Sequence, residues 1–366
     1  MDRPTRTLFN ALWKGVLLFV ILDLLVALIP PGAFSRLSLY NSVFPGRQRL
    51  PFGENIQRSD NLSLYDLDAM FASLALPAAK PAGEYRVLVV GDSSVWGTLL
   101  RPGETLAGQL NALDLPSRDG RRVVAYNLGY PTMSLTKDLL LLERAAQYQP
   151  DLILWPVTLQ SLPRSAQLSS PIVANNAAGV RSLIQRYGLD LDAAALSEPT
   201  FWGRTLIGQR RALADFFRLQ LLGLPWAATG IDQDYPADYT PAARDLEADV
   251  TFAGLSGPDL PADALAWDAL RAGMQMAGDT PVLLVNEPIL ISNGKNSDLR
   301  YNFFYPRWAY DAYRAQLAGL AAANNWRYLD LWDAVPETHF TNSAVHLDPS
   351  GEAALARKIG AEIGNR

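Results

Sequence analysis

A serine lies where a buried strand is expected to give way to the start of a helix. Residues 87–90 form a continuous apolar run, and Gly91-Asp92-Ser93-Ser94 follows it directly. Such a run, bounded by a turn signal, is typical of a strand buried on both faces of a parallel sheet. A helix N-terminus carries unpaired N–H groups that can bind a developing oxyanion. Ser93 is therefore a candidate nucleophile, and the alternative is that the two serines only cap the helix.

A serine hydroxyl is a weak nucleophile unless a base takes its proton. The chain holds two histidines, His339 and His346, and no cysteine. The lack of cysteine excludes disulfides, thiol nucleophiles and thiolate metal sites. Two histidines alone offer no spacing typical of metal ligands, so we expect neither a metal nor another cofactor.

Composition excludes some classes of protein. The chain has 366 residues, of which 49% are hydrophobic and 19% are charged. This length suits one large α/β domain with an insertion, or two domains. The net charge of -5 and the pI of about 5.2 argue against a nucleic-acid partner.

The pattern of apolar runs predicts the elements that position these residues. We expect strands at 87–90, 123–128, 152–157, 281–285 and 326–331. We expect helices at 106–113, 135–148, 263–277, 307–324 and 352–363. This alternation predicts an α/β fold with three layers, α/β/α, around a parallel sheet of about five strands. Ligands gather at the carboxyl ends of such strands, which is where Ser93 lies. Pro156 in the third strand predicts a bulge or a strand end.

Residues 161–280 interrupt the alternation of strands and helices. Within them, 203–222 is an apolar and basic helix candidate, followed by Gly223 and Pro225. Its pattern leaves two interpretations open: it covers the sheet, or it lies on a membrane surface. Residues 231–259 are acidic and rich in proline, which indicates a loop.

The N-terminal region predicts a membrane anchor. Residues 8–29 are mostly apolar and would span about 33 Å as a helix, enough for a bilayer core. A cleaved signal peptide and a buried helix are the alternatives, and a small-x-small cleavage site is missing after the apolar run. Basic residues flank both ends, so the positive-inside rule does not decide the orientation. Asp23, expected at mid-membrane depth, marks either a contact with another membrane protein or a tolerated charge.

These features divide the chain into three parts. Residues 1–30 are the N-terminal tail and anchor, and residues 31–84 are an extended linking segment with a short helix candidate at 62–74. Residues 85–366 are the main domain, with its insertion at about 161–280.

Four blocks of the sequence resemble the SGNH, or GDSL-like, hydrolase superfamily: residues 91–97, 127–129, 150–161 and 343–351. The resemblance covers about 85–160 and 281–363, and it implies a flavodoxin-like fold. It implies that Ser93 is the nucleophile and His346 the base. It also implies that the N–H groups of Ser93 and Gly129 are oxyanion donors.

The third and last blocks depart from the family pattern. Gln160 stands where the family has an asparagine whose amide is the third oxyanion donor, and Gln carries the same donor one methylene farther out. Ser343 stands where the family has the aspartate that orients the histidine. Ser343, Asp348 and Asp333 are candidates for that role here, although Ser343 lacks the charge and either aspartate would need a different geometry. A backbone carbonyl is a further candidate.

Two hypotheses about function remain. The first is a membrane-anchored serine esterase or O-acyl transferase that acts on acyl esters of an envelope glycan or lipid. As the resemblance implies, it would sit in the cell membrane by a single span, with the soluble domain outside the cytoplasm. The second is a catalytically inactive protein of the same fold that binds a glycan or serves as a subunit of a membrane assembly. The changes at Gln160 and Ser343 favour the second.

Overall fold

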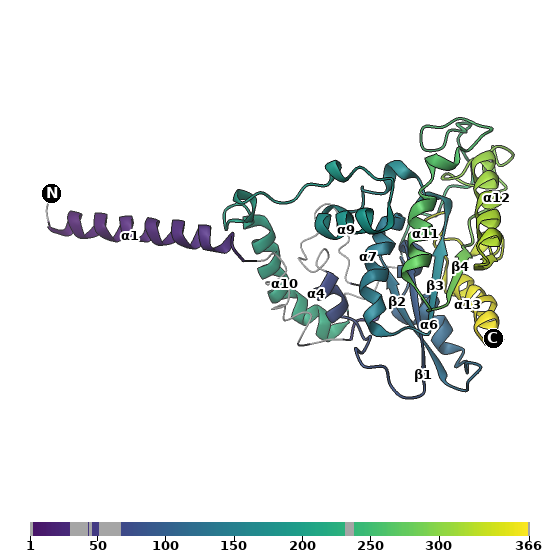
Figure 1. Cartoon of the computed structure of the whole chain (residues 1–366), viewed down its shortest axis with the longest axis horizontal. Coiled ribbons are helices and arrows are strands. Elements are labelled where there is room, and N and C mark those ends of the chain that lie inside the picture. The colour runs from purple at the N-terminus through teal and green to yellow at the C-terminus, as the bar shows by residue number, and fades with distance from the viewer. Residues whose placement is uncertain (1–2, 30–42, 44–45, 51–66, 231–237, 365–366) are drawn as a thin grey trace.

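The sheet at the centre of the molecule is parallel throughout. The computed structural model describes residues 3–29, 43, 46–50, 67–230 and 238–364. The strands are β1 (Glu84–Gly91), β2 (Arg122–Gly129), β3 (Leu152–Val157), β4 (Val282–Asn286) and β5 (Arg327–Asp330). They lie in the order β2-β1-β3-β4-β5, the flavodoxin-like order (Figure 1). The predicted fold class is confirmed.

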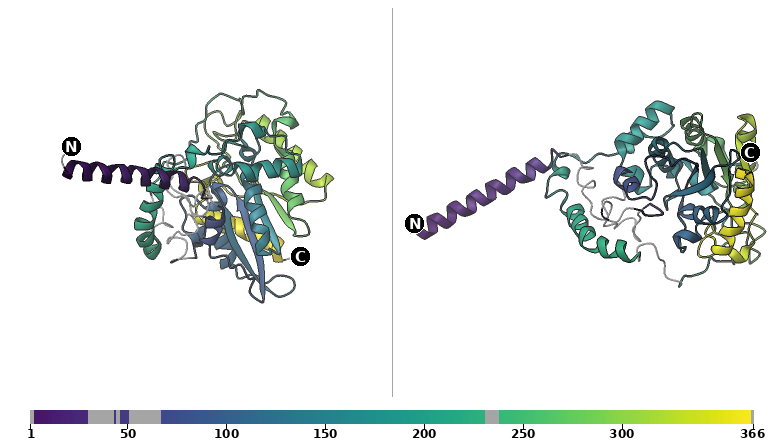
Figure 2. Two further views of the ribbon diagram at one scale, coloured as in Figure 1. Left: turned by 60° about the vertical axis from the view of Figure 1, so that its left-hand side comes forward. Right: turned by 90° about the horizontal axis from the view of Figure 1, so that it is seen from below.

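Helices cover both faces of the sheet, as Figure 2 shows. On one face lie α6 (Leu106–Ala112) and α13 (Pro349–Gly364). On the other lie α7 (Leu135–Ala145), α11 (Trp267–Met276) and α12 (Arg307–Ala323). The shorter helices are α4 (Leu67–Ala72), α5 (Ser93–Trp96), α8 (Pro171–Ala174) and α9 (Ala177–Tyr187).

Strand β1 shows why these runs are apolar at every position. Val87 and Val89 belong to the core beneath α6 and α13, whereas Leu88 and Val90 belong to the core beneath α7. All four side chains are fully buried. Side chains alternate between the faces of a strand, so a strand covered on both faces has no polar side.

The pairing of β1 with β3 is shorter than its pairing with β2. It covers only Val87–Val89 of β1 and ends at Leu154 of β3, while β1 pairs with β2 over its whole length. In β3 the Ile153 N–H points away from β1, to the Pro281 carbonyl. The nitrogen of Pro156 therefore faces β1 and has no hydrogen to donate. The pairing ends where this donor is missing, although the two backbones stay close, since a Cβ on Gly91 would lie 3.4 Å from the Pro156 carbonyl oxygen.

Helix α1 (Arg3–Val26) projects from the rest of the molecule (Figure 1). Its residues Thr5–Val26 are long and apolar enough to cross a membrane. The expected position of Asp23 at mid-membrane depth is wrong, because Asp23 lies in the last turn of this helix. Its Oδ1 accepts a hydrogen bond of 2.8 Å from the Ile207 N–H, so the partner of Asp23 belongs to this chain.

The helix of the insertion is longer than expected. Helix α10 (Arg210–Thr229) begins after the predicted start and continues through Gly223 and Pro225, which were expected to end it. Pro225 removes one helical hydrogen bond but does not end the helix. In the N-terminal segment, α4 matches part of the helix expected at 62–74. Most of the extended segment 31–84 before α4, and residues 231–237 of the expected loop, lie outside the described residues.

Candidate functional site

Ser93 is the first residue of α5, immediately beyond the carboxyl end of β1. Asp92 caps this short helix, because its Oδ1 accepts the Ser94 N–H at 2.9 Å. Gly97 ends the helix in the left-handed region, with φ of 85°. Ser93 is partly exposed, whereas Asp92 and Val95 are buried. The strand and the tight helical turn thus present the Ser93 hydroxyl at the carboxyl end of the sheet.

A residue from the N-terminal segment fastens this turn. The Arg49 guanidinium lies 4.1 Å from the centre of the Trp96 ring and donates to the carbonyls of Gly97 (2.9 Å) and Leu100 (3.0 Å). Arg49 is buried, and such a charge needs these partners. Residues before the main domain therefore help to fix the helix that carries Ser93.

The structure brings Ser93, His346 and Asn342 together in a line. The Ser93 Oγ lies 2.8 Å from His346 Nε2, and His346 Nδ1 lies 2.8 Å from Asn342 Oδ1. An amide oxygen only accepts, so Nδ1 carries the proton and Nε2 is free to accept from the serine hydroxyl. This is the tautomer that a general base needs.

Burial keeps the His346 imidazole neutral. Desolvation lowers the pKa of His346 to about 4, and the nearby Asp92 carboxylate opposes this shift. At neutral pH the ring is therefore in its basic form. A low pKa also makes it a weaker base than an imidazole paired with a carboxylate, because proton transfer follows the pKa of the acceptor.

The predicted orienting residues need correction. Neither Ser343 nor Asp348 bonds the His346 ring within the described part of the chain. Asp348 lies instead against the other histidine, with its Oδ2 3.0 Å from His339 Nδ1. Its Oδ1 accepts the Gly351 N–H at 2.7 Å, which caps α13. Two structural contacts thus occupy this carboxylate.

Asn342 is the orienting residue that sequence reasoning missed. The Thr341 N–H donates to the His346 carbonyl at 2.9 Å, and Phe340 forms an antiparallel bridge with Leu347. This closed turn places residue 342 beside residue 346. The only signal in the sequence was an amide side chain close to His346, and nothing in it predicts the turn.

The structure changes the predicted set of oxyanion donors. The Gly129 N–H donates at 2.9 Å to the side chain of Asn127, so this predicted donor already has a partner. A Cβ on Gly129 would lie 2.3 Å from the Trp96 nitrogen, which explains the glycine by the close approach of β2 to α5. Gly129 therefore has a packing role.

The other two predicted donors lie at the site with free groups. The Ser93 N–H has no acceptor among the described residues. Gln160 lies in the turn of 3-10 helix Leu159–Ser161 that follows β3, and its backbone N–H is 3.4 Å from the Tyr305 hydroxyl. Its partly exposed side-chain amide forms no hydrogen bond within the described part of the chain.

The chain matches solved structures of esterases in fold. It has a structural match to a member of the lipolytic protein G-D-S-L family from Veillonella parvula, with 13% identity and a TM-score of 0.36 over 77% of this chain and 98% of that one. A putative arylesterase from Agrobacterium tumefaciens matches with 14% identity and a TM-score of 0.35 over 76% of this chain and 98% of that one. No family model and no curated protein matches at a significant level. Statements about chemistry therefore rest on the geometry of the site.

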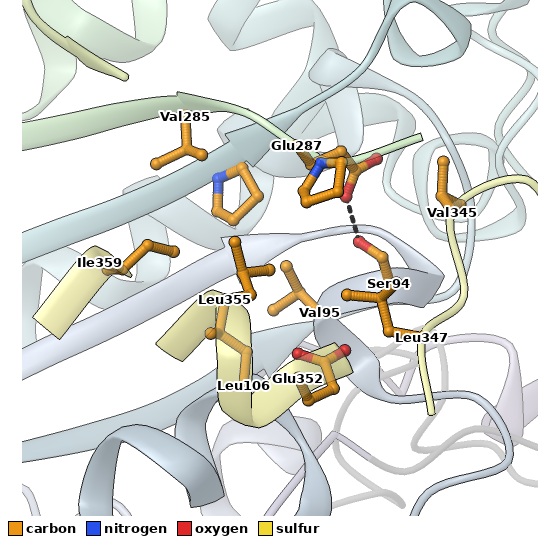
Figure 3. Close-up of a pocket in the computed structure, with 12 residues that line it drawn as sticks. Ser94, Val95, Leu106, Val285, Glu287, Val345, Leu347, Glu352, Leu355 and Ile359 are labelled. Carbon is orange, nitrogen blue, oxygen red and sulfur yellow. Dashed lines mark hydrogen bonds between the residues drawn. The ribbon is translucent and has the colours of Figure 1, made fainter. Parts of the chain in front are cut away.

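A buried carboxyl group lies directly behind the nucleophile turn. Ser94 Oγ donates a short hydrogen bond to Glu287 Oε2, which comes from the loop after β4 (Figure 3). Burial raises the pKa of Glu287 well above its usual range, and the carboxylate of Asp92 adds to the shift. The hydrogen bond to Glu287 thus occupies the Ser94 hydroxyl.

A second buried carboxyl group faces the same small cavity. Burial, with a contribution from Asp348, raises the pKa of Glu352 to about 8. Glu352 and Glu287 each have one carboxyl oxygen with no hydrogen-bond partner, and both line a cavity of about 10 Å³ between the sheet and α13 (Figure 3). That volume is close to the room of one water molecule. The cavity is too small for an acyl group, so it lies behind the site and does not receive a substrate.

An ion pair lies beneath the end of β1. Lys137 Nζ donates to the Gly91 carbonyl at 2.6 Å and lies 2.6 Å from Asp138 Oδ1. Trp155 Nε1 donates to the other oxygen of Asp138 at 3.1 Å. Through the bond to the Gly91 carbonyl, Lys137 connects α7 to the end of β1. Among the described residues, no three histidine, aspartate or glutamate side chains are grouped so as to hold a metal ion.

Proposed function

We propose that this protein is a serine ester hydrolase or O-acyl transferase whose reaction uses Ser93 and His346. The contact of 2.8 Å between Ser93 Oγ and His346 Nε2, two partly exposed residues, carries the proposal. A serine and a histidine in this contact are the minimum that nucleophilic acyl transfer needs.

In the proposed reaction, Ser93 Oγ attacks the ester carbonyl carbon while His346 Nε2 takes the hydroxyl proton. The tetrahedral intermediate carries its negative charge on the former carbonyl oxygen, which the Ser93 N–H and the Gln160 amide can bind. When the intermediate collapses, the C–O bond breaks and the leaving alcohol takes the proton from His346. Water or an acceptor hydroxyl then attacks the acyl-serine, with His346 again as the base.

Asn342 acts as a positioning residue in this scheme. Its Oδ1 holds the Nδ1–H of His346, so it fixes the tautomer and the plane of the ring. Unlike a carboxylate, it does not stabilise the imidazolium by charge. In a serine protease, replacement of the triad aspartate by asparagine lowers kcat about 10⁴-fold through the wrong tautomer of the histidine. Asn342 accepts from Nδ1–H and keeps the correct tautomer, so only the missing charge remains as a cost. We therefore expect slow turnover with a simple ester.

We propose that α1 is an uncleaved anchor and that the domain of residues 85–366, with its insertion at 161–280, lies outside the cytoplasm. The single apolar helix at the N-terminus and the bond between Asp23 and the insertion support an anchor that remains attached. The substrate class would be acyl esters of an envelope glycan or lipid. A carbohydrate acetylesterase family member from Sinorhizobium meliloti is among the structures of similar fold, at 16% identity and a TM-score of 0.33 over 76% of this chain and 96% of that one.

A fluorophosphonate probe tests the chemistry directly, because it labels only an activated serine. We expect labelling of the full-length chain and turnover of p-nitrophenyl acetate, both lost in Ser93→Ala. Ser94→Ala is the matched control, because Ser94 is adjacent but points to Glu287, and it should still be labelled. Absence of labelling and turnover in a folded wild-type chain would overturn the enzyme proposal.

The bond of the Gly129 N–H to Asn127 favours a second candidate. With that donor occupied and the orienting residue neutral, the chain could be an inactive member of the fold that binds a glycan or a membrane partner. Glycan binding that survives Ser93→Ala, in a wild-type chain without turnover, would support this candidate.

A further inference from the structure

An apolar stripe runs along the exposed side of α10. Ala214, Phe217, Leu221, Pro225 and Ala228 are all exposed, and they recur every three or four residues. Phe217 is 61% exposed and Leu221 is 76% exposed. Residues at this spacing share one face of a helix. Single exposed apolar residues are ordinary, but a continuous stripe of them marks a contact surface.

The chain just before α10 adds to this stripe. Trp202, in the 3-10 helix Trp202–Arg204, is 69% exposed, and Phe201 packs against its edge. Ile207 is exposed as well. Tryptophan is enriched where proteins meet the membrane–water interface. Together, these side chains extend the apolar surface to the residue that bonds Asp23.

The bond between Asp23 and Ile207 places this surface at the base of α1. Asp23 lies in the last turn of α1, and the preceding residues, from Thr5 to Leu22, span about 27 Å. If they cross the bilayer, the bond lies where the helix leaves it. Both views in Figure 2 show α10 beginning at the base of α1 and running across its direction. A helix in that position lies near the plane of the membrane.

The charges near the start of α10 suit a lipid headgroup layer. Arg210 and Arg211 are exposed in its first turn. The opposite side of the helix turns to the body of the protein, because Phe216 is buried there. An apolar face with flanking arginines is typical of helices that bind in the interface of an anionic bilayer.

We propose that α10 and the preceding residues 201–207 lie in the surface of the bilayer that α1 crosses, and that they hold the domain against the membrane. This proposal rests on the proposed anchor. The occupant of the stripe is the lipid surface and not a second copy of the chain, because the bond to α1 fixes the stripe beside the point where the anchor emerges.

The lack of cysteine makes the test direct. Full-length protein is reconstituted in vesicles of zwitterionic and anionic phospholipid, with one cysteine that carries an NBD fluorophore. Three positions are compared. Leu221→Cys lies on the stripe and Val16→Cys lies in the middle of α1. Lys358→Cys, at an exposed position of α13, is the matched control. Lipids with a nitroxide on the acyl chain quench only fluorophores that lie in the bilayer.

We expect the Val16→Cys and Leu221→Cys probes to be quenched several-fold more than the Lys358→Cys probe. Adding Phe217→Glu should lower the quenching at position 221 and leave that at position 16 unchanged. If position 16 is quenched and position 221 behaves like position 358, the surface contact is overturned and the anchor stands. If position 16 is not quenched, the anchor itself is wrong.

A dimer gives a different pattern. A stripe that a second copy covers would shield the Leu221→Cys probe from water at high protein density. It would not quench with lipid nitroxides, and the shielding would fall as the protein is diluted in lipid. That outcome would also overturn the proposal.

Discussion

The two histidines of this chain lie seven residues apart and have opposite surroundings. His339 has a carboxylate on its ring, since Asp348 lies 3.0 Å from Nδ1, but it has no serine. His346 has the serine, with Ser93 Oγ 2.8 Å from Nε2, but an amide in place of a carboxylate. The loop before α13 thus holds two histidines and a carboxylate, but the ring that faces Ser93 is not the ring that contacts the carboxylate.

The comparison shows that contact decides what a residue does, and distance along the chain does not. Asp348 is only two residues from His346, yet it caps α13 and bonds His339. Helix α13 begins at Pro349, so the side chain of Asp348 lies where it can accept from the free N–H groups of the first turn. The carboxylate is therefore used in structure, and the ring that faces Ser93 is oriented by Asn342.

The largest expected difference between the two rings is in turnover. His346→Ala should lower kcat/KM for p-nitrophenyl acetate by about 10²–10⁴-fold, because general base catalysis contributes that much. His339→Ala, the matched control, should change it only a few-fold. Equal losses in two variants that melt like the wild type would remove the distinction between the rings.

Asn342→Asp supplies the missing charge. The carboxylate should stabilise the imidazolium of His346 in the transition state, so we expect kcat to rise about tenfold. Asn342→Ala, which removes the orienting bond, should lower kcat. A fall in both variants, with the fold intact, would show that the neutral amide suits this site better than a carboxylate.

The pH dependence of kcat/KM reports the surroundings of His346. Its pKa is lowered to about 4, so the basic form persists, and activity should fall only as the pH drops through about 4, not near 6.5. Between about pH 6.5 and pH 4, His346 binds a proton in the unfolded chain but not in the folded chain. The free energy of unfolding should therefore decrease as the pH decreases through this range. In Asn342→Asp the acid limb should move upward by about 1–3 units. An acid limb near pH 6.5 in the wild type would contradict the burial of the ring.

The smallest expected effect concerns the carboxylate at His339. Asp348→Ala should lower the free energy of unfolding by about 1 kcal/mol, because it removes the cap of α13. Asp348→Asn keeps an oxygen for the Gly351 N–H, so it should lose less. Neither variant should change kcat by more than a few-fold, which thermal melting and ester turnover can check together. A large loss of kcat in Asp348→Asn would place this residue at the reaction after all.

The fold could be predicted well from the sequence, because its signals are local. Each predicted strand overlaps an observed one, and β3 has the predicted bounds, since apolar runs and turn residues mark both ends. The end of α10 was wrong, because Gly223 and Pro225 were expected to end the helix and it continues to Thr229.

The site could be predicted only in part. The contact between Ser93 and His346 follows from two blocks that lie at one edge of the sheet. The partner of His346 depends on the turn that closes at Thr341, and the loss of the Gly129 N–H depends on one hydrogen bond to Asn127. Both are details of side-chain direction, which no periodicity in the sequence records.

Pro156 limits the pairing of β1 with β3 beside Ser93 through the covalent structure of a single residue. Proline has no N–H, so no rearrangement of the surrounding side chains can supply the missing donor. Every other amino acid at position 156 would restore an N–H that faces β1, and with it the means to extend the pairing toward Gly91.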